Sequence, residues 1–408
     1  MTGFSRLGRR GTFWSAAAVL ALCLWASGAP SVLYPVYAAQ WNLSPVVMTS
    51  IFAAYPLALL LVLLFFGGLS DAIGRRRAML WGIALIGVSA VVFAVAPHVG
   101  FLFAGRVLQG VGTGLALGAA SAALVEHNIS GNLRFASSLA TVSTSTGLTL
   151  ALLLSGLLAQ IAPLPLVLSF GVLLALSLVV LLLVWFTPDD TDRNRARWAP
   201  TLLRLPPGGR RVFIASTLSV SVAYAVGAVF LSLGAQMARE LTGTTNLAVI
   251  GGLLAVSAFV IGVTALFLSR VHAHLAIVVG AVLSLGGLGL MVATAASGSL
   301  ALFLLWCILG GVGYSFAFTG GLSLLNRTAP SHHRGATLSM MCLVGYLFQA
   351  VTSIGAGALA TGLGLATAVY LAAASVAVLA VVSAVCAIVD LRSVHSQRVR
   401  VRRSRTPE

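Results

Sequence analysis

The chain has 408 residues, of which 59% are hydrophobic and only 8% are charged, whereas a soluble protein has about 25% charged residues. So few charges cannot cover a water-facing surface, and the composition therefore excludes a soluble enzyme. The formal net charge of +16 comes from 24 basic residues, all arginine, and 8 acidic residues. Such a charge would suggest a nucleic-acid partner in a soluble protein, but in a membrane protein the positions of basic residues indicate orientation.

Long apolar segments fill most of the chain. A helix needs about 20 mostly apolar residues to cross a bilayer, and the backbone there must satisfy its own hydrogen bonds. The sequence therefore predicts an all-α polytopic membrane protein with twelve transmembrane helices. The predicted spans are roughly 13–38, 46–67, 78–96, 101–125, 135–160, 164–186, 212–235, 247–268, 275–296, 300–325, 336–360 and 366–389. The first span follows three arginines as a secretory signal would, but its length favours an uncleaved helix.

A polar segment at residues 187–211 divides the spans into two groups of six. We expect an N-terminal half at 1–186, a linker at 187–211, a C-terminal half at 212–389 and an arginine-rich tail at 390–408. The sequence Gly-Val-Gly at 110–112 recurs at 311–313, an offset of 201 positions. Two pseudo-symmetric halves with a binding site between them near the midplane are a typical transporter plan.

The arginines are distributed unequally between the two sides of the predicted membrane. Twenty-two of the 24 fall in the N-terminus, the linker, the tail and the loops on one side. Because basic loops stay in the cytoplasm, we expect both termini there. The tail then favours contact with anionic lipid over nucleic-acid binding. The four cysteines lie within apolar runs without metal-ligand spacing, and no metal site is expected.

The loop after the second span contains a specific motif. Residues 67–77 read GGLSDAIGRRR. This segment resembles the cytoplasmic signature G-x-L-x-D-x-x-G-R-R/K of the major facilitator superfamily, departing only at Ala72, where a basic residue is usual. The resemblance implies secondary transport by alternating access, without a cofactor or an enzymatic activity, by a monomer in the inner membrane of a bacterium.

The same resemblance implies a conformational latch for the outward-facing state. An aspartate in this loop meets the start of helix 11, and an arginine–carboxylate relay joins it to helix 4. The alternative is that the three arginines only anchor the loop on the cytoplasmic side. The latch residues would be Gly67, Asp71, Gly74, Arg75 and Glu126.

The fourth span carries Arg106, the only charge predicted within any span. Charges at that depth are costly and are usually functional. Arg106, Gln109 and Gly110 match the family signature R-x-x-Q-G-x-G, in which the arginine is linked to proton coupling. The alternative is that the arginine extends along its helix to the membrane interface.

The fifth span is similar to the exporter signature G-x-x-x-G-P-x-x-G-G. Gly147 and Gly156 match it, but Ala151 and Leu152 replace the central Gly-Pro and Ser155 replaces a glycine. The similarity favours an exporter, although without proline the helix lacks the cause of the usual bend. By position in the family plan, a substrate cavity would be lined by Tyr34, Tyr224, Tyr314, Tyr346 and Gln349. For any single one of these residues, a packing or interface role is the favoured alternative.

None of the eight acidic residues falls at the middle of a predicted span. A cationic substrate is therefore disfavoured. We expect proton-linked export of a small neutral or weakly anionic organic solute, such as a drug-like molecule, a metabolite or a sugar, driven by the proton gradient. Facilitated or proton-symport uptake of a nutrient is the alternative, and a non-transporting sensor or scaffold is a remote one.

Overall fold

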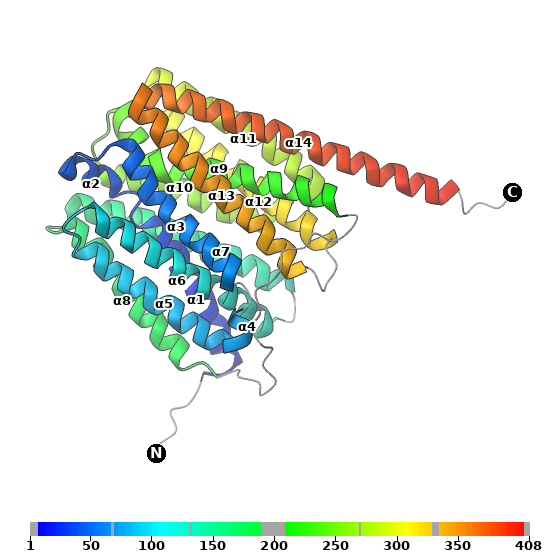
Figure 1. Ribbon diagram of the computed structural model, residues 1–408, viewed down its shortest axis with the longest axis horizontal. Coiled ribbons are helices and arrows are strands. Elements are labelled where there is room, and N and C mark those ends of the chain that lie inside the picture. The colour runs from blue at the N-terminus through cyan, green and yellow to red at the C-terminus, as the bar shows by residue number, and fades with distance from the viewer. Residues whose placement is uncertain are drawn as a thin grey trace, which may run out of the picture.

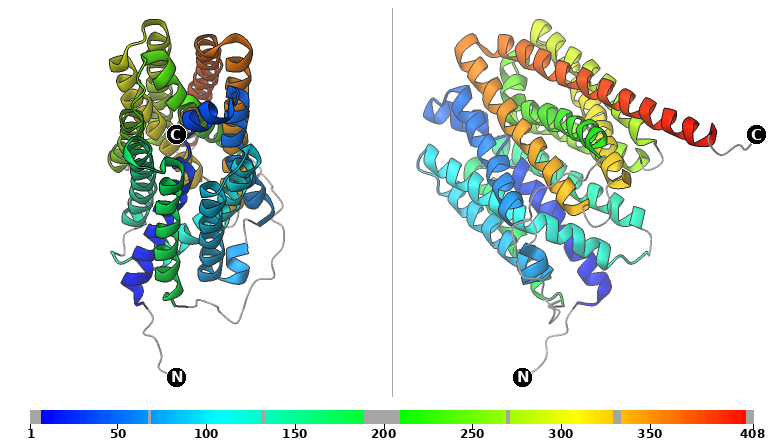
Figure 2. Two further views of the ribbon diagram at one scale, coloured as in Figure 1. Left: turned by 90° about the vertical axis from the view of Figure 1, so that its left-hand side faces the viewer. Right: turned by 45° about the vertical axis from the view of Figure 1, so that its right-hand side comes forward.

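The computed structural model describes residues 7–66, 69–130, 133–188, 209–268, 271–328 and 334–403. Twelve helices in this part of the chain are long and apolar enough to cross a membrane. They form two groups of six that lie side by side and correspond to the two halves of the chain (Figures 1 and 2). Most of the predicted linker lies outside the described residues, and the next helix begins at Arg210.

The N-terminal half consists of six spans and two short helical segments. Its elements are α1 (Arg9–Gly28), α2 (Tyr34–Trp41), α3 (Pro45–Phe66), α4 (Leu69–Ile73), α5 (Arg75–Ala94), α6 (Val99–Glu126), α7 (Leu133–Ile161) and α8 (Pro165–Trp185). The first predicted span is therefore not one helix, because α1 ends at Gly28 and α2 begins at Tyr34. Proline supplies the reason: Pro30 and Pro35 lack the N–H that a continuous helix would need at these positions.

The C-terminal half has one helix for each span. Its elements are α9 (Arg210–Thr242), α10 (Leu247–Phe267), α11 (Ala273–Ser297), α12 (Leu300–Thr328), α13 (Arg334–Leu363) and α14 (Leu365–Arg403). The last helix continues well beyond the predicted end of its span at residue 389, so that much of the arginine-rich tail is an extension of α14. This extension projects from the bundle in Figure 1.

Helix boundaries repeat between the halves with the offset that the Gly-Val-Gly repeat indicated. Helices α6 and α12 begin at Val99 and Leu300, and α7 and α13 begin at Leu133 and Arg334; each pair is 201 positions apart. Each half has its own large apolar core, made mainly by its own helices. The halves are thus two similar packing units rather than one twelve-helix core.

The two halves meet along two pairs of helices, α7 with α10 and α3 with α13. We call the end of the bundle where α1 begins and α14 ends the terminal face, and the opposite end the distal face. At the distal face the halves are joined by direct hydrogen bonds, such as the one between Val46 and Thr361. Toward the terminal face, Phe66 and Phe267 at the ends of α3 and α10 are exposed, and α1 and α14 point apart (Figure 1). The halves are closed together at the distal face and diverge toward the terminal face.

Candidate functional site: a buried arginine and its surroundings

Arg106 is fully buried, with 0% of its surface exposed. It lies seven residues after the start of α6 at Val99, which places its Cα about 10 Å along the helix at 1.5 Å per residue. Its Nε donates to the Tyr34 hydroxyl at 2.9 Å, and its Nη1 donates to the Ser27 carbonyl oxygen at 3.0 Å and to Gln109 Oε1 at 3.1 Å. The side chain is therefore held inside the N-terminal half and does not extend to the membrane interface.

Three aromatic rings surround the guanidinium group. Its central carbon lies 5.6 Å from the ring centre of Tyr34 and 5.5 Å from those of Phe52 and Tyr55. Rings at this distance attract a cation through their negative faces, and the attraction is stronger away from water. No carboxylate pairs with Arg106 among the described residues. Aromatic rings and neutral oxygens thus take the place of a counter-ion.

The break between α1 and α2 creates one of these oxygens. In a continuous helix the Ser27 carbonyl oxygen would accept from the N–H four residues later. The Ser31 N–H instead donates to Gly28 at 3.0 Å, since the chain turns at Pro30. The Ser27 oxygen is consequently available to Arg106. The prolines of the first span therefore help to hold the arginine of the fourth.

Two buried donors at this site have no acceptor in the structure. They are Arg106 Nη2 and Gln109 Nε2, which belong to adjacent turns of α6. A buried donor without a partner costs about 1–3 kcal/mol, and more when it is charged. The pair could donate hydrogen bonds to an oxygen acceptor of a ligand, such as a carbonyl, hydroxyl or carboxylate group.

Three of the four tyrosines of the C-terminal half form an aromatic cluster. Tyr224 of α9 stacks on Tyr346 of α13 with ring centres 4.8 Å apart, and Tyr314 of α12 stacks on Phe318 at 6.0 Å. Gln349, one turn beyond Tyr346, is buried with its Oε1 unpartnered. The structure therefore brings three of the five predicted cavity residues together, with Gln349 on the next turn of α13, and places Tyr34 beside Arg106.

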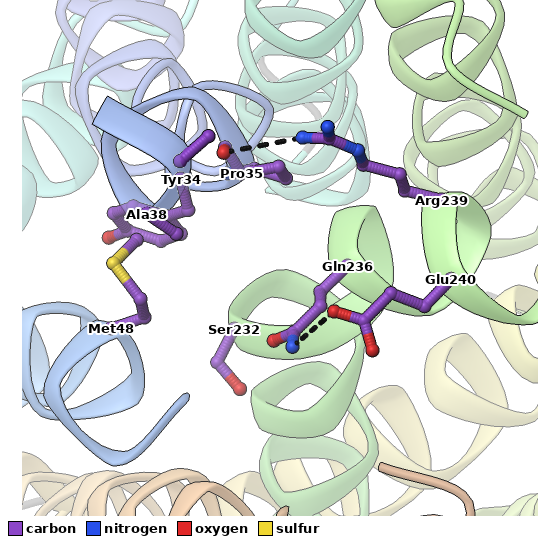
Figure 3. Close-up of a pocket in the computed structure, with 9 residues that line it drawn as sticks. Tyr34, Pro35, Ala38, Met48, Ser232, Gln236, Arg239 and Glu240 are labelled. Atoms are coloured by element: carbon purple, nitrogen blue, oxygen red, sulfur yellow. Dashed lines mark hydrogen bonds between the residues drawn. The ribbon is translucent and has the colours of Figure 1, made fainter. Parts of the chain in front are cut away.

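A pocket of about 360 Å³ lies between the halves near the distal face. Its polar lining comes mainly from one face of α9, where the Gln236 Nε2 donates to Glu240 Oε1 at 2.8 Å (Figure 3). Tyr34 also lines it, so that one residue connects this pocket with Arg106. The pocket was not predicted from the sequence, although Ser232, Gln236, Arg239 and Glu240 recur at helical spacing along α9.

The glycines of α7 are points of close helix packing. A Cβ at Gly147 would collide with the backbone of Ala21 in α1, and one at Gly156 would lie 2.6 Å from the Leu247 carbonyl oxygen of α10. Similarly, a Cβ at Gly110 of α6 would collide with the backbone of α3. Ser155 is buried. Gly147 thus fastens α7 to its own half, whereas Gly156 faces the other half.

Two residues of the predicted latch contact each other within the N-terminal half. Arg75 Nη2 lies 3.0 Å from Glu126 Oε1, and Arg75 Nη1 donates to Ser70 Oγ at 3.0 Å. Gly74 has a φ of 96°, a conformation that favours glycine. Gly67 lies outside the described residues, as does the side chain of Asp71. Their part in a latch stays a prediction.

A buried histidine–aspartate contact at the terminal face was also not predicted. His274 Nε2 lies 2.9 Å from Asp390 Oδ2, and the Asp390 side chain is only 4% exposed. The pair joins the first turn of α11 to α14. Nothing in the sequence indicated it, because the two residues are separated by 116 positions.

Comparison with known proteins identifies the family. The family model of the Major Facilitator Superfamily matches residues 14–283, about two thirds of the chain. The chain belongs to the major facilitator superfamily. It is therefore a multi-pass membrane transporter and not an enzyme, as the sequence predicted.

Solved structures of superfamily members share the whole fold. A bacterial homologue of the human lysosomal transporter Spinster, in an inward-facing and occupied conformation, has a TM-score of 0.72 and 15% identity, covering 94% of this chain and 97% of that one. The nucleoside transporter NupG has a TM-score of 0.72 and 13% identity, covering 93% and 99%. At these identities the likeness shows the fold alone.

One curated relative is similar in sequence. The lincomycin resistance protein of Streptomyces lincolnensis is 34% identical over 134 residues. The match spans 32% of this chain and 28% of that protein. It is thus a partial likeness to a resistance protein.

Proposed function

We propose that this transporter exports a small neutral or weakly anionic organic solute in exchange for protons. The observation that carries the proposal is the buried Arg106, which has a free donor beside the free donor of Gln109 and no carboxylate partner among the described residues. A site with positive charge and unpaired donors favours acceptor oxygens and disfavours cations.

The direction of transport rests on two weaker indications. The glycines of α7 partly match the exporter signature, and the partial relative is a resistance protein. The excess of arginine at the terminal face favours an orientation with that face toward the cytoplasm. The membrane we propose is the plasma membrane of a bacterium. With that orientation, the state in which the halves diverge toward the cytoplasm is the one that receives a cytoplasmic solute.

In this mechanism Arg106 stays charged throughout, since a guanidinium group does not lose its proton in a protein. Protons must therefore be carried by a carboxylate near either face. Asp71 and Glu126 lie toward the terminal face and Glu240 toward the distal face. The role of Arg106 is to bind the solute and to respond electrostatically to the charge of such a group.

The test is a flux assay in proteoliposomes with an imposed pH gradient and an internal pH dye. We expect protons to move only when the solute is present, and the solute to move in the direction opposite to the protons. Solute entering together with protons would instead establish uptake. Arg106→Ala should lower gradient-driven flux about a hundredfold, because two or more hydrogen bonds to a charged group are lost, while Arg10→Ala, at an exposed position, should not. Full transport by Arg106→Ala would refute the proposed role.

A further inference from the structure

The distal face carries two hydrogen bonds that cross between the halves in the same way. The Val46 N–H, in the first turn of α3, donates to Thr361 Oγ1 at 2.9 Å. The Leu247 N–H, in the first turn of α10, donates to Gln160 Oε1 at 2.8 Å. Both donors belong to the group of N–H bonds that a helix start leaves without a partner. In each case the acceptor is a side chain of the other half.

These two contacts are related by the internal repeat. Val46 and Leu247 are 201 positions apart, and so are Gln160 and Thr361. This is the offset that relates the helix boundaries of the halves. The same helix start and the same acceptor position are therefore used twice, at two corners of the interface, although glutamine stands at one acceptor position and threonine at the other.

A glycine one turn before each acceptor allows the close approach that the bond requires. Gly156 precedes Gln160 by four residues and Gly357 precedes Thr361 by four, so each pair lies on one face of its helix. A Cβ at Gly156 would lie 2.6 Å from the Leu247 carbonyl oxygen, and one at Gly357 would lie 2.9 Å from that of Pro45. These glycines also differ by 201 positions.

The Thr361 hydroxyl is oriented for this contact. Its own proton is donated to the Gly357 carbonyl oxygen at 2.9 Å, which leaves the oxygen lone pairs for the Val46 N–H. At the other corner, Asn246 accepts from the second and third N–H groups of α10, so that Gln160 takes the one that remains at Leu247. The helix starts are thus capped partly by their own half and partly by the opposite half.

We infer that Gln160 and Thr361 are positioning residues of the transport cycle, which hold the distal gate shut by capping the first turns of α10 and α3 across the interface. When the halves separate at the distal face, both caps must break and both N–H groups pass to water. The two corners then act as equivalent, independent fastenings of the state in which the distal face is closed. This inference does not depend on the substrate or on the direction of transport.

The test measures the distance between the halves at the distal face by double electron–electron resonance in nanodiscs. Spin labels are placed at Leu164 and Leu300, in a full-length chain whose four native cysteines are replaced by alanine. Thr361→Val keeps the shape of the side chain and removes the hydroxyl; Gln160→Leu removes the amide acceptor. Each should raise the population ratio of distal-open to distal-closed molecules about threefold, and the double variant about tenfold, as expected for independent hydrogen bonds.

Two further variants separate capping from a general loss of packing. Thr361→Ser retains the hydroxyl and should keep the distance distribution of the unmodified chain. Thr294→Val removes a hydroxyl that bonds to Leu290 within α11, and it should leave the distribution unchanged. The inference is overturned if Thr361→Val and Gln160→Leu leave the distribution unchanged, or if Thr361→Ser shifts it as much as Thr361→Val.

Discussion

The two halves of this transporter share a plan but differ at the buried position that Arg106 occupies. Arg106 of α6 and Cys307 of α12 are 201 positions apart and are each seven residues from the start of their helix. Arg106 is held by oxygens and aromatic rings. Cys307 belongs instead to an apolar core with Trp306 and Phe303. The pseudo-symmetry thus holds for the positions of the helices. At this position, however, the charge is present in the N-terminal half alone.

The same comparison explains the broken first span. Helices α1 and α2 together correspond to α9, since Arg9 and Arg210 begin them and the offset is again 201. At the position equivalent to Pro30, the C-terminal half has Leu231, and α9 is continuous there. Only the half that has the arginine has the break that frees a carbonyl oxygen for it. The buried arginine and the break between α1 and α2 therefore occur in the same half and are in direct contact.

The largest effect is expected when the charge is moved to the other half. Cys307→Arg would place a guanidinium group against Trp306 and Phe303 without an acceptor, and should lower the free energy of unfolding by about 3 kcal/mol. Arg106→Leu, by contrast, should destabilise less, because removal of a costly buried charge offsets the acceptors that it leaves unpaired. Thermal unfolding in detergent compares the two. Equal destabilisation by both variants would contradict the view that only the N-terminal half accommodates a charge at this position.

Pro30→Leu would give the N-terminal half the residue of its counterpart. The N–H of Ser31 could then return to the Ser27 carbonyl oxygen, and Arg106 would lose one acceptor. We expect gradient-driven flux to fall about tenfold, since the lost bond involves a charged group. The matched control is Leu231→Ala in α9, which should transport normally. Full activity of Pro30→Leu would show that the break serves another purpose.

Tyr34→Phe tests the aromatic residue that belongs to both the arginine site and the distal pocket. The ring remains for the cation–π contact, but the acceptor for Arg106 Nε is removed. Flux should fall about fivefold, less than for Arg106→Ala, because only one neutral acceptor is lost. The same assay in proteoliposomes measures it. A loss as large as that of Arg106→Ala would assign Tyr34 a direct role in binding.

The smallest effect is expected at the terminal face, where the halves also differ. Glu126 pairs with Arg75, and the position equivalent to Glu126 is Arg327 in the other half. The Glu126 side chain is 47% exposed, so Glu126→Gln should change the free energy of unfolding by no more than about 0.5 kcal/mol. A large loss of gradient-driven flux in Glu126→Gln, without a matching loss of stability, would indicate a latch or a proton carrier rather than a surface ion pair.

Much of the fold could be predicted because it depends on local composition. The number of spans, the position of the polar linker and the loop motif at 67–77 can all be read within short windows of sequence. The internal offset of 201 was visible in Gly-Val-Gly and holds for the starts of three helix pairs, α1 with α9, α6 with α12 and α7 with α13. Arg106 was recognisable as a candidate site residue because a charge in an apolar span is costly wherever the helix packs.

The contacts of that residue could not be predicted in the same way. Which oxygens Arg106 meets depends on how α1, α3 and α6 pack, and on a carbonyl oxygen made available by a backbone break. The pairing of His274 with Asp390 and the stacking of Tyr224 on Tyr346 likewise join distant helices. Such contacts leave no periodic signal in the sequence.

By itself, the sequence determined that this protein spans a membrane with two similar groups of helices and carries one arginine within a span. These properties follow from the transfer free energy of each residue and from spacing along a helix, both of which are local. The tertiary structure alone decided that Arg106 is sealed by aromatic rings and that Gln160 and Thr361 cap helices of the opposite half. The first arrangement depends on how α1, α3 and α6 pack within one half. The second depends on where the two halves meet, which the close helix packing at Gly156 and Gly357 permits.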